Sequence, residues 1–105
     1  MLDMSQLARS EDIWERRTAI VATAHFIRHG DVDDTFRIAE ILRNDDHDLV
    51  HKATGWMLRA AGEADRQKLL TFLDRHAVAT PRMMLRYAIE HLDKEQRDNY
   101  LSMKK

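Results

Sequence analysis

Apolar residues recur at helical spacing along most of the chain, and no stretch alternates apolar and polar residues over six positions. Alternation is the pattern of a half-buried strand, whereas apolar positions three and four residues apart form one face of a helix. The first long segment shows the helical pattern at Ile13, Ile20, Ala24 and Ile27. The sequence therefore predicts an all-α fold without strands.

Signals that start and stop helices divide the chain into six predicted helices. Ser10, followed by two acidic residues, predicts the first N-cap, and Gly30 predicts the end of that helix. Thr80, followed by a proline, predicts a later N-cap, and Asp93 with a glutamine three residues on resembles a capping box. The expected helices cover about residues 11–29, 35–43, 48–62, 63–77, 81–92 and 94–103.

These helices form antiparallel pairs with short loops, and the pairs repeat weakly. The segment that begins at Asp12 aligns with one that begins at Asp48, and a third copy opens at Thr80. Helix pairs at a period of about 35 residues are typical of α-solenoids, and the absence of a tetratricopeptide pattern favours a HEAT-like solenoid. An irregular six-helix bundle is the alternative. The first ten residues are expected to form a helical stub that packs on the first pair.

Composition narrows the classes of function. The 105 residues correspond to one small domain or part of a larger one. Lys and Arg number 17 against 18 Asp and Glu, so the bulk basic charge of many nucleic-acid binders is absent, although a basic face can exist within a neutral total. Without cysteine, the chain has no disulfide, thiolate nucleophile or Cys-ligated metal. Neither a membrane-length apolar run nor a secretory signal is present, which makes the cytoplasm the expected compartment.

The residues themselves give little support for metal or nucleophilic chemistry. Two histidine pairs, at 25 and 29 and at 47 and 51, have the spacing that places both imidazoles on one helical face, but neither lies in an HExxH motif. Exposed or helix-terminal histidines are the simpler interpretation. Glycine-rich phosphate loops and G-x-S-x-G are absent, and the acids cluster in turns, where they cap helices. We expect no metal and no cofactor.

Basic residues fall at related places on alternate predicted helices. In a solenoid, equivalent helices line one concave face, so these residues would form a basic strip suited to phosphates. A solvated helix face with ordinary intrahelical ion pairs is the alternative. The six residues of the predicted strip are Arg16, Arg17, Lys52, Arg59, Arg82 and Arg86.

Trp56 lies on one helical stripe with Lys52 and Arg59. An indole between two cations suits a surface that contacts the sugar or a cationic base of a nucleic acid. Composition alone favours the other interpretation, a buried Trp56. The neighbouring Gly55 costs a helix about 1 kcal/mol relative to alanine and predicts close approach by another backbone or a ligand.

Three segments carry a family resemblance: I-W-E-R-R-T-A-I-V from Ile13, H-K-A-T-G-W-M-L-R from His51, and P-R-M-M-L-R-Y-A-I-E from Pro81. In this order they resemble the C-terminal half of the AlkD-type DNA alkylation repair family. The resemblance extends from about Ser10 to Leu101. It implies a HEAT-like α-solenoid whose concave, basic face grips duplex DNA.

The resemblance also implies an activity. Members of the family are DNA glycosylases that remove N3- and N7-alkylated purines, whose bases are positively charged. They need neither a metal nor a base-binding pocket, whereas most glycosylases extrude the base into a pocket. An aspartate stabilises the charge that develops on the sugar, two tryptophans pack on the backbone beside the lesion, and an arginine assists.

Carried over by position, the resemblance assigns Arg17 as the active-site arginine and Trp56 as the second of those tryptophans. Arg59 matches a contact to the DNA backbone, and Lys52 and His25 are further candidate contacts. The expected partner is duplex DNA that carries alkylated purines.

The chain departs from the family at the catalytic aspartate and first tryptophan, which lie in a W-W-D-x-V-D-like segment ahead of the W-x-R-R helix. Asp3 has no such surroundings. We therefore expect residues 1–105 to be the C-terminal part of a larger solenoid domain and to be inactive alone. A non-catalytic HEAT-like module that binds DNA or protein is the alternative function.

Trp14 is expected to pack between repeats, and self-association is expected at the apolar end that contains Leu2, Met4 and Leu7.

Overall fold

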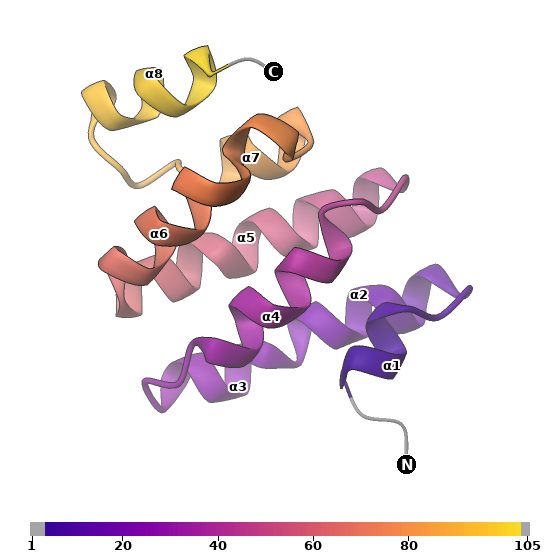
Figure 1. Cartoon of the computed structure of the whole chain (residues 1–105). Coiled ribbons are helices and arrows are strands. Elements are labelled where there is room, and N and C mark those ends of the chain that lie inside the picture. The colour runs from indigo at the N-terminus through magenta and orange to yellow at the C-terminus, as the bar shows by residue number, and fades with distance from the viewer. Residues whose placement is uncertain (1–3, 104–105) are drawn as a thin grey trace.

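The computed structural model describes residues 4–103, and within that range the chain is helical with no strand, which confirms the predicted fold class. The elements in chain order are α1 (Met4–Ala8), α2 (Ile13–Val21), α3 (Thr23–Arg28), α4 (Asp33–Leu42), α5 (Asp48–Ala64), α6 (Arg66–His76), the 3₁₀ turn η1 (Ala77–Ala79), α7 (Arg82–Ala88) and α8 (Lys94–Ser102) (Figure 1).

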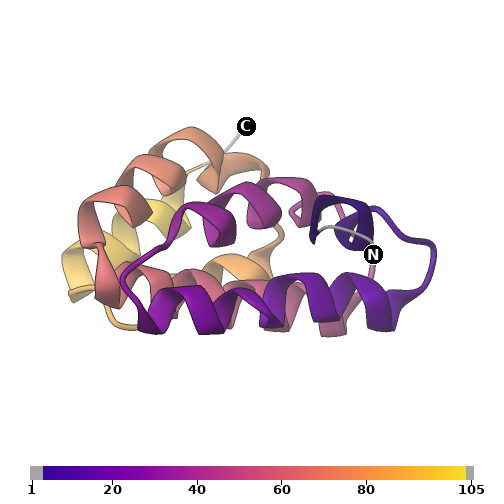
Figure 2. The ribbon, with the colours of Figure 1, turned by 90° about the horizontal axis from the view of Figure 1, so that it is seen from below.

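The helices are stacked in two layers (Figure 2). The first layer consists of α2 with α3, then α5, then α7, side by side; the second contains α1, α4 and α6. The long helix α5 packs against α2, α4, α6 and α7, and α8 lies beside η1 at the C-terminal end. Each first-layer helix is thus followed by a returning helix, which is the arrangement of a HEAT-like α-solenoid.

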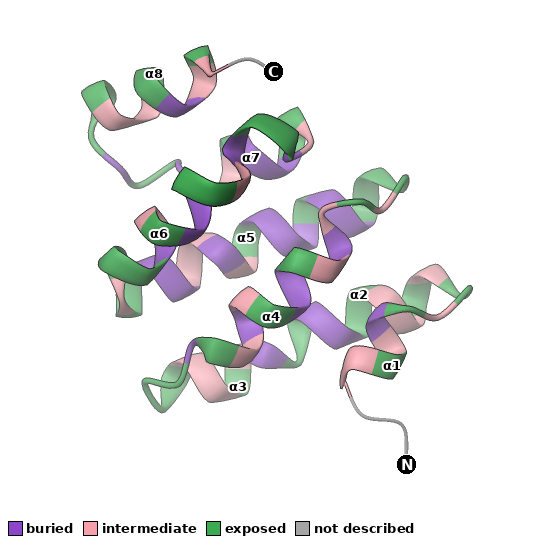
Figure 3. Cartoon of the chain, viewed as in Figure 1, coloured by how far each residue is buried: buried purple, intermediate pink, exposed green. Residues whose placement is uncertain are grey.

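The apolar faces of both layers meet in one core (Figure 3). Burying one such side chain stabilises the fold by about 1.5–3 kcal/mol, so the contact between layers determines which helix faces remain outside. The largest fully buried apolar side chains are Ile20, Ile38, Leu42, Leu58, Leu73, Met84, Leu85, Ile89, Val32 and Val50.

Aspartates cap α2, α6 and α8, whereas Val32 stands at the cap of α4 without a side-chain bond and His47 caps α5. The first long helix begins at Asp12 and not at Ser10 as predicted, because the Asp12 carboxylate accepts the Trp14 amide at 2.9 Å. The Ser10 hydroxyl instead accepts the Asp12 amide at 3.0 Å. Asp65 caps α6, which starts three residues later than predicted. Asp93 caps α8 as predicted.

The predicted helix 11–29 is divided at Ala22 into α2 and α3. The Thr23 hydroxyl donates to the Ile20 carbonyl at 2.6 Å and competes there with the regular backbone ladder. Gly30 ends α3 as predicted, with a φ of +83° that side-chain-bearing residues rarely adopt.

The predicted start at Thr80 is wrong in detail. Its hydroxyl donates backwards, to the His76 carbonyl at 2.6 Å, so Pro81 occupies the cap position without a side-chain bond. The helix α7 ends at Ala88 and not near Leu92.

The N-terminal stub packs on the first pair as expected. Met4 and Leu7 of α1 are partly buried against the core, and Leu2 lies outside the described residues. Self-association at this end stays a prediction. Among the described helices, none has the length and apolar character that crossing a membrane requires.

Candidate nucleic-acid interface

Three exposed basic residues occupy the same place in successive first-layer helices. Each stands five positions after the N-cap of its helix, and the three helices pack side by side. Packed helices lie 8–10 Å apart, and three of them span about 20 Å. The caps are Asp12, His47 and Pro81, and the basic residues, called here the cation row, are Arg17, Lys52 and Arg86.

Within residues 4–103, no member of the cation row has an ion pair or a side-chain hydrogen bond. The Lys52 ammonium lies 6.0 Å from the Trp56 ring centroid, over the face of the indole. A phosphate can therefore bind these cations without displacing a carboxylate of the protein. Arginine and lysine free of internal partners are the side chains that supply phosphate contacts.

Arg16, next to Arg17, uses its guanidinium for bonds within the protein. Its Nε donates to the Asp45 carboxylate at 2.5 Å, and its Nη1 donates to the carbonyls of Ser10 and Glu11 at 2.9 and 3.0 Å. Only 6% of the Asp45 side chain is exposed. Arg16 thus ties the start of α2 to the turn before α5.

The remaining predicted DNA contacts also interact with other residues of the protein. Arg59 forms an ion pair with Glu90, and Arg82 donates to the Leu101 carbonyl at 2.9 Å. His25 is exposed on α3, and its ring meets those of two neighbours edge-on. The structure therefore separates the six residues of the basic strip into the three of the cation row and three that bond within the fold.

Trp56 is exposed over 45% of its surface, so the interpretation of a buried Trp56 is wrong. Its ring centroid lies 5.4 Å from the Arg59 guanidinium and 6.2 Å from the Tyr87 ring, in a T-shaped contact. Each cation–π contact at an exposed site contributes about 0.5–1 kcal/mol. The indole is thereby held on the outer face of α5, one turn beyond Lys52.

A second exposed row was missed by sequence reasoning. Trp14 does not pack between repeats as expected: 62% of it is exposed. Leu49 of α5 and Met83 of α7 occupy the equivalent place, two positions after their caps, and both are exposed. Aligning the helices on their caps would have found this apolar row.

The rows share one surface. On α7, Met83 and Arg86 line a single open groove of about 600 Å³ together with Tyr87 and Glu90. Residues spaced by three, four and seven positions lie on one side of a helix, so Leu49, Lys52 and Trp56 lie on one side of α5. Each of α2, α5 and α7 thus carries an exposed apolar residue followed by an exposed cation, and on α5 Trp56 follows the cation one turn later.

Gly55 permits this surface to form. A Cβ at Gly55 would lie 2.7 Å from the Met84 carbonyl oxygen and 2.7 Å from Tyr87 Cβ, so α5 and α7 touch there. The predicted close approach of another backbone is confirmed. This contact between α5 and α7 brings the rings of Trp56 and Tyr87 together.

His47 and His51 form hydrogen bonds within the fold, whereas His25 and His29 are exposed. His47 caps α5, with Nδ1 accepting the Leu49 amide at 3.2 Å. His51 is buried, contrary to the expectation of exposed or terminal histidines, and its Nε2 bonds to the Asp45 carbonyl. In the described part of the chain, no three His, Cys, Asp or Glu side chains are grouped so that they could hold a metal ion.

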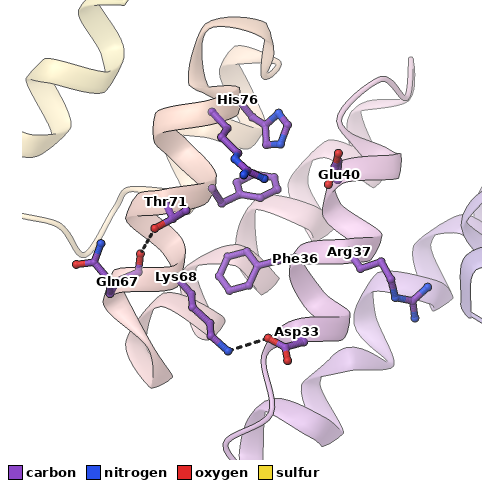
Figure 4. A pocket seen from close by; sticks show the side chains of 10 residues that line it. Asp33, Phe36, Arg37, Glu40, Gln67, Lys68, Thr71 and His76 are labelled. Atoms are coloured by element: carbon purple, nitrogen blue, oxygen red, sulfur yellow. Dashed lines mark hydrogen bonds and ion pairs between the residues drawn. The ribbon is translucent and has the colours of Figure 1, made fainter.

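A separate cleft of about 280 Å³ opens between α4 and α6 in the second layer (Figure 4). Phe72 lines the cleft, and its ring centroid lies 5.6 Å from that of Phe36 and 4.8 Å from that of His76. An ion pair between Lys68 and Asp33, at 2.8 Å, lies at one end. Burial lowers the pKa of His76, and two neighbouring arginines lower it further. Because α4 and α6 form the other layer, this cleft does not extend the surface that carries the cation row.

Comparison with known proteins identifies one match. A family model described as "DNA alkylation repair enzyme" matches residues 2–92. No curated protein and no solved structure was found to match the chain. The matched range includes all of α2, α5 and α7, and with them the whole cation row.

Proposed function

Since the chain belongs to the DNA alkylation repair enzyme family, we propose that the outer face of α2, α5 and α7 binds duplex DNA during the excision of N3- or N7-alkylated purines. The observation that carries the proposal is the cation row: three exposed, unpaired cations, each five positions after the cap of its helix, on adjacent helices. Phosphates along a duplex strand present a regular line of negative charge that such a row complements.

Arg17 and Trp56 are the residues we propose for the lesion itself. Breaking the glycosidic bond leaves positive charge on the deoxyribose, and the face of an indole stabilises a cation that approaches it. Trp56 is exposed and held from two sides, so little side-chain entropy is lost when a sugar packs on it. Arg17 supplies a charged donor to the phosphate beside that sugar. No residue of this chain is assigned as the catalytic acid.

A non-catalytic module is the second candidate. The observation in its favour is the same absence of an assigned acid, together with a net charge of −1. Such a module would use the cation row to hold DNA without chemistry. Duplex binding that persists while the complete gene product releases no alkylated base would favour it.

The binding proposal is tested by titrating an unmodified duplex at several salt concentrations. Three phosphate contacts give a slope of log K against log salt of about −2.7, because each contributes about −0.9. Replacing the whole cation row by alanine should bring the slope near zero. Arg75→Ala is the matched control, since Arg75 is an exposed arginine of α6 in the other layer. Equal losses in the control and the triple variant would contradict the proposal.

A further inference from the structure

Glu90 places a carboxylate on the proposed DNA-binding face. It lies just past the end of α7, nine positions after the cap, which is the place that Trp56 occupies in α5. It lines the same open groove as Arg86 and Tyr87. A carboxylate there repels the phosphates that the cation row attracts, so its position needs an explanation.

The carboxylate of Glu90 is bonded to Arg59 across the contact between α5 and α7. The Arg59 side chain is 22% exposed and that of Glu90 is 54% exposed. The same guanidinium lies 5.4 Å from the Trp56 ring centroid. Glu90 therefore keeps Arg59 against the indole, and an arginine so engaged is unavailable to a phosphate.

We propose that Glu90 determines selectivity: it withholds Arg59 from the phosphates of ordinary duplex and presents negative charge beside Trp56, where a cationic alkylated base is favoured over a neutral one. The inference rests on the proposed function, since it assumes that this face meets DNA. Glu90 acts through Arg59 and through its own charge, so it is a positioning residue and takes no part in breaking the bond.

Glu63 offers a matched control. It lies one turn beyond Arg59 on α5, is equally exposed, and is paired with His91, not with an arginine. Glu63→Gln and Glu90→Gln each remove one negative charge from neighbouring positions. Only Glu90→Gln releases a guanidinium.

The experiment measures the affinity of wild type, Glu90→Gln, Glu63→Gln and Arg59→Ala/Glu90→Gln for two duplexes. One is unmodified, and the other carries a single 7-methylguanine in the same sequence. For Glu90→Gln we expect two- to fivefold tighter binding of the unmodified duplex and a salt slope steeper by about 0.9, because one more cation reaches a phosphate. The affinity for the modified duplex should increase less, so the ratio of the affinity for modified duplex to that for unmodified duplex falls.

Glu63→Gln should keep the wild-type slope and ratio, and Arg59→Ala/Glu90→Gln should lose the added slope. A Glu90→Gln variant with the slope and ratio of wild type, or with those of Glu63→Gln, overturns this inference alone. If wild type binds neither duplex, the proposed function is overturned as well. Matching melting temperatures among the variants show that the comparison concerns binding and not folding.

Discussion

Gly55 of α5 lies directly against Met84 of α7: a Cβ at Gly55 would be 2.7 Å from the Met84 carbonyl oxygen. That oxygen belongs to the backbone, so the clash is relieved only if one helix moves. This contact joins the second and third first-layer helices, and the places of Lys52, Trp56 and Arg86 depend on it.

Gly55→Ala should lower the free energy of unfolding by about 1–2 kcal/mol. Overpacking costs about 1–3 kcal/mol, and the better helix propensity of alanine offsets up to about 1 kcal/mol of that. Urea denaturation followed by circular dichroism measures the change. Gly62→Ala is the comparison. The nearest atom to a Cβ at Gly62 is a methyl carbon of the Leu69 side chain, which can rotate, so this variant should lose less free energy of unfolding than Gly55→Ala. An unchanged midpoint for Gly55→Ala would contradict the described contact.

The adjacent arginines 16 and 17 should have opposite effects. Arg16→Ala leaves the nearly buried Asp45 carboxylate without its cation and should cost about 1–3 kcal/mol of stability. Arg17→Ala removes an exposed, unpaired side chain and should change stability by less than about 0.5 kcal/mol. The duplex titration should show the reverse order, with a slope reduced by about 0.9 for Arg17→Ala. Equal stability losses would argue against the separation of the two roles.

Trp56→Ala and Arg17→Ala should each lower the release of 7-methylguanine by the complete gene product by about tenfold or more. A tenfold factor corresponds to about 1.4 kcal/mol in the transition state, supplied by a cation–π contact from Trp56 and by a charge-assisted hydrogen bond from Arg17. Single-turnover release from a modified duplex measures it. Arg75→Ala is the control, because Arg75 is an exposed residue of α6 in the other layer, away from the proposed DNA-binding face. Unchanged release in both variants removes the assignment of the lesion site.

Tyr100 should make the protein sensitive to alkali. Burial raises the pKa of Tyr100 to about 12 from 10.0, and the hydrogen bond that its hydroxyl donates to Asp74 at 2.8 Å adds to this. Above pH 10 the unfolded chain loses the phenolic proton while the folded protein keeps it, so stability falls as the pH rises from 10 to 12. The loss attributable to this group is about 1–3 kcal/mol. In Tyr100→Phe, urea midpoints across that range should fall less steeply than in wild type.

The sequence predicted the helical class, the solenoid and the close contact at Gly55, because apolar spacing, caps and a mid-helix glycine are local signals. It did not predict the division at Ala22, where the Thr23 hydroxyl takes a carbonyl that a continuous helix would use. Nor could it separate Arg16 from Arg17, since the difference depends on Asp45, 29 residues away in the chain. Trp14 is expected to pack between repeats, yet Ala19 and Ile20 form the buried side of α2 and Trp14 lies exposed.

The Gly55 contact also acts as a spacer. Lys52 and Arg86 stand on adjacent helices, and the smallest possible side chain at Gly55 lets the axes of α5 and α7 lie close together. The phosphates of a DNA strand have a fixed spacing. A bulkier residue at position 55 would change the separation of the two cations, so that it no longer matches the spacing of the phosphates. A substitution in the interior would then change which phosphates are reached, although every residue that we propose to contact DNA is unchanged.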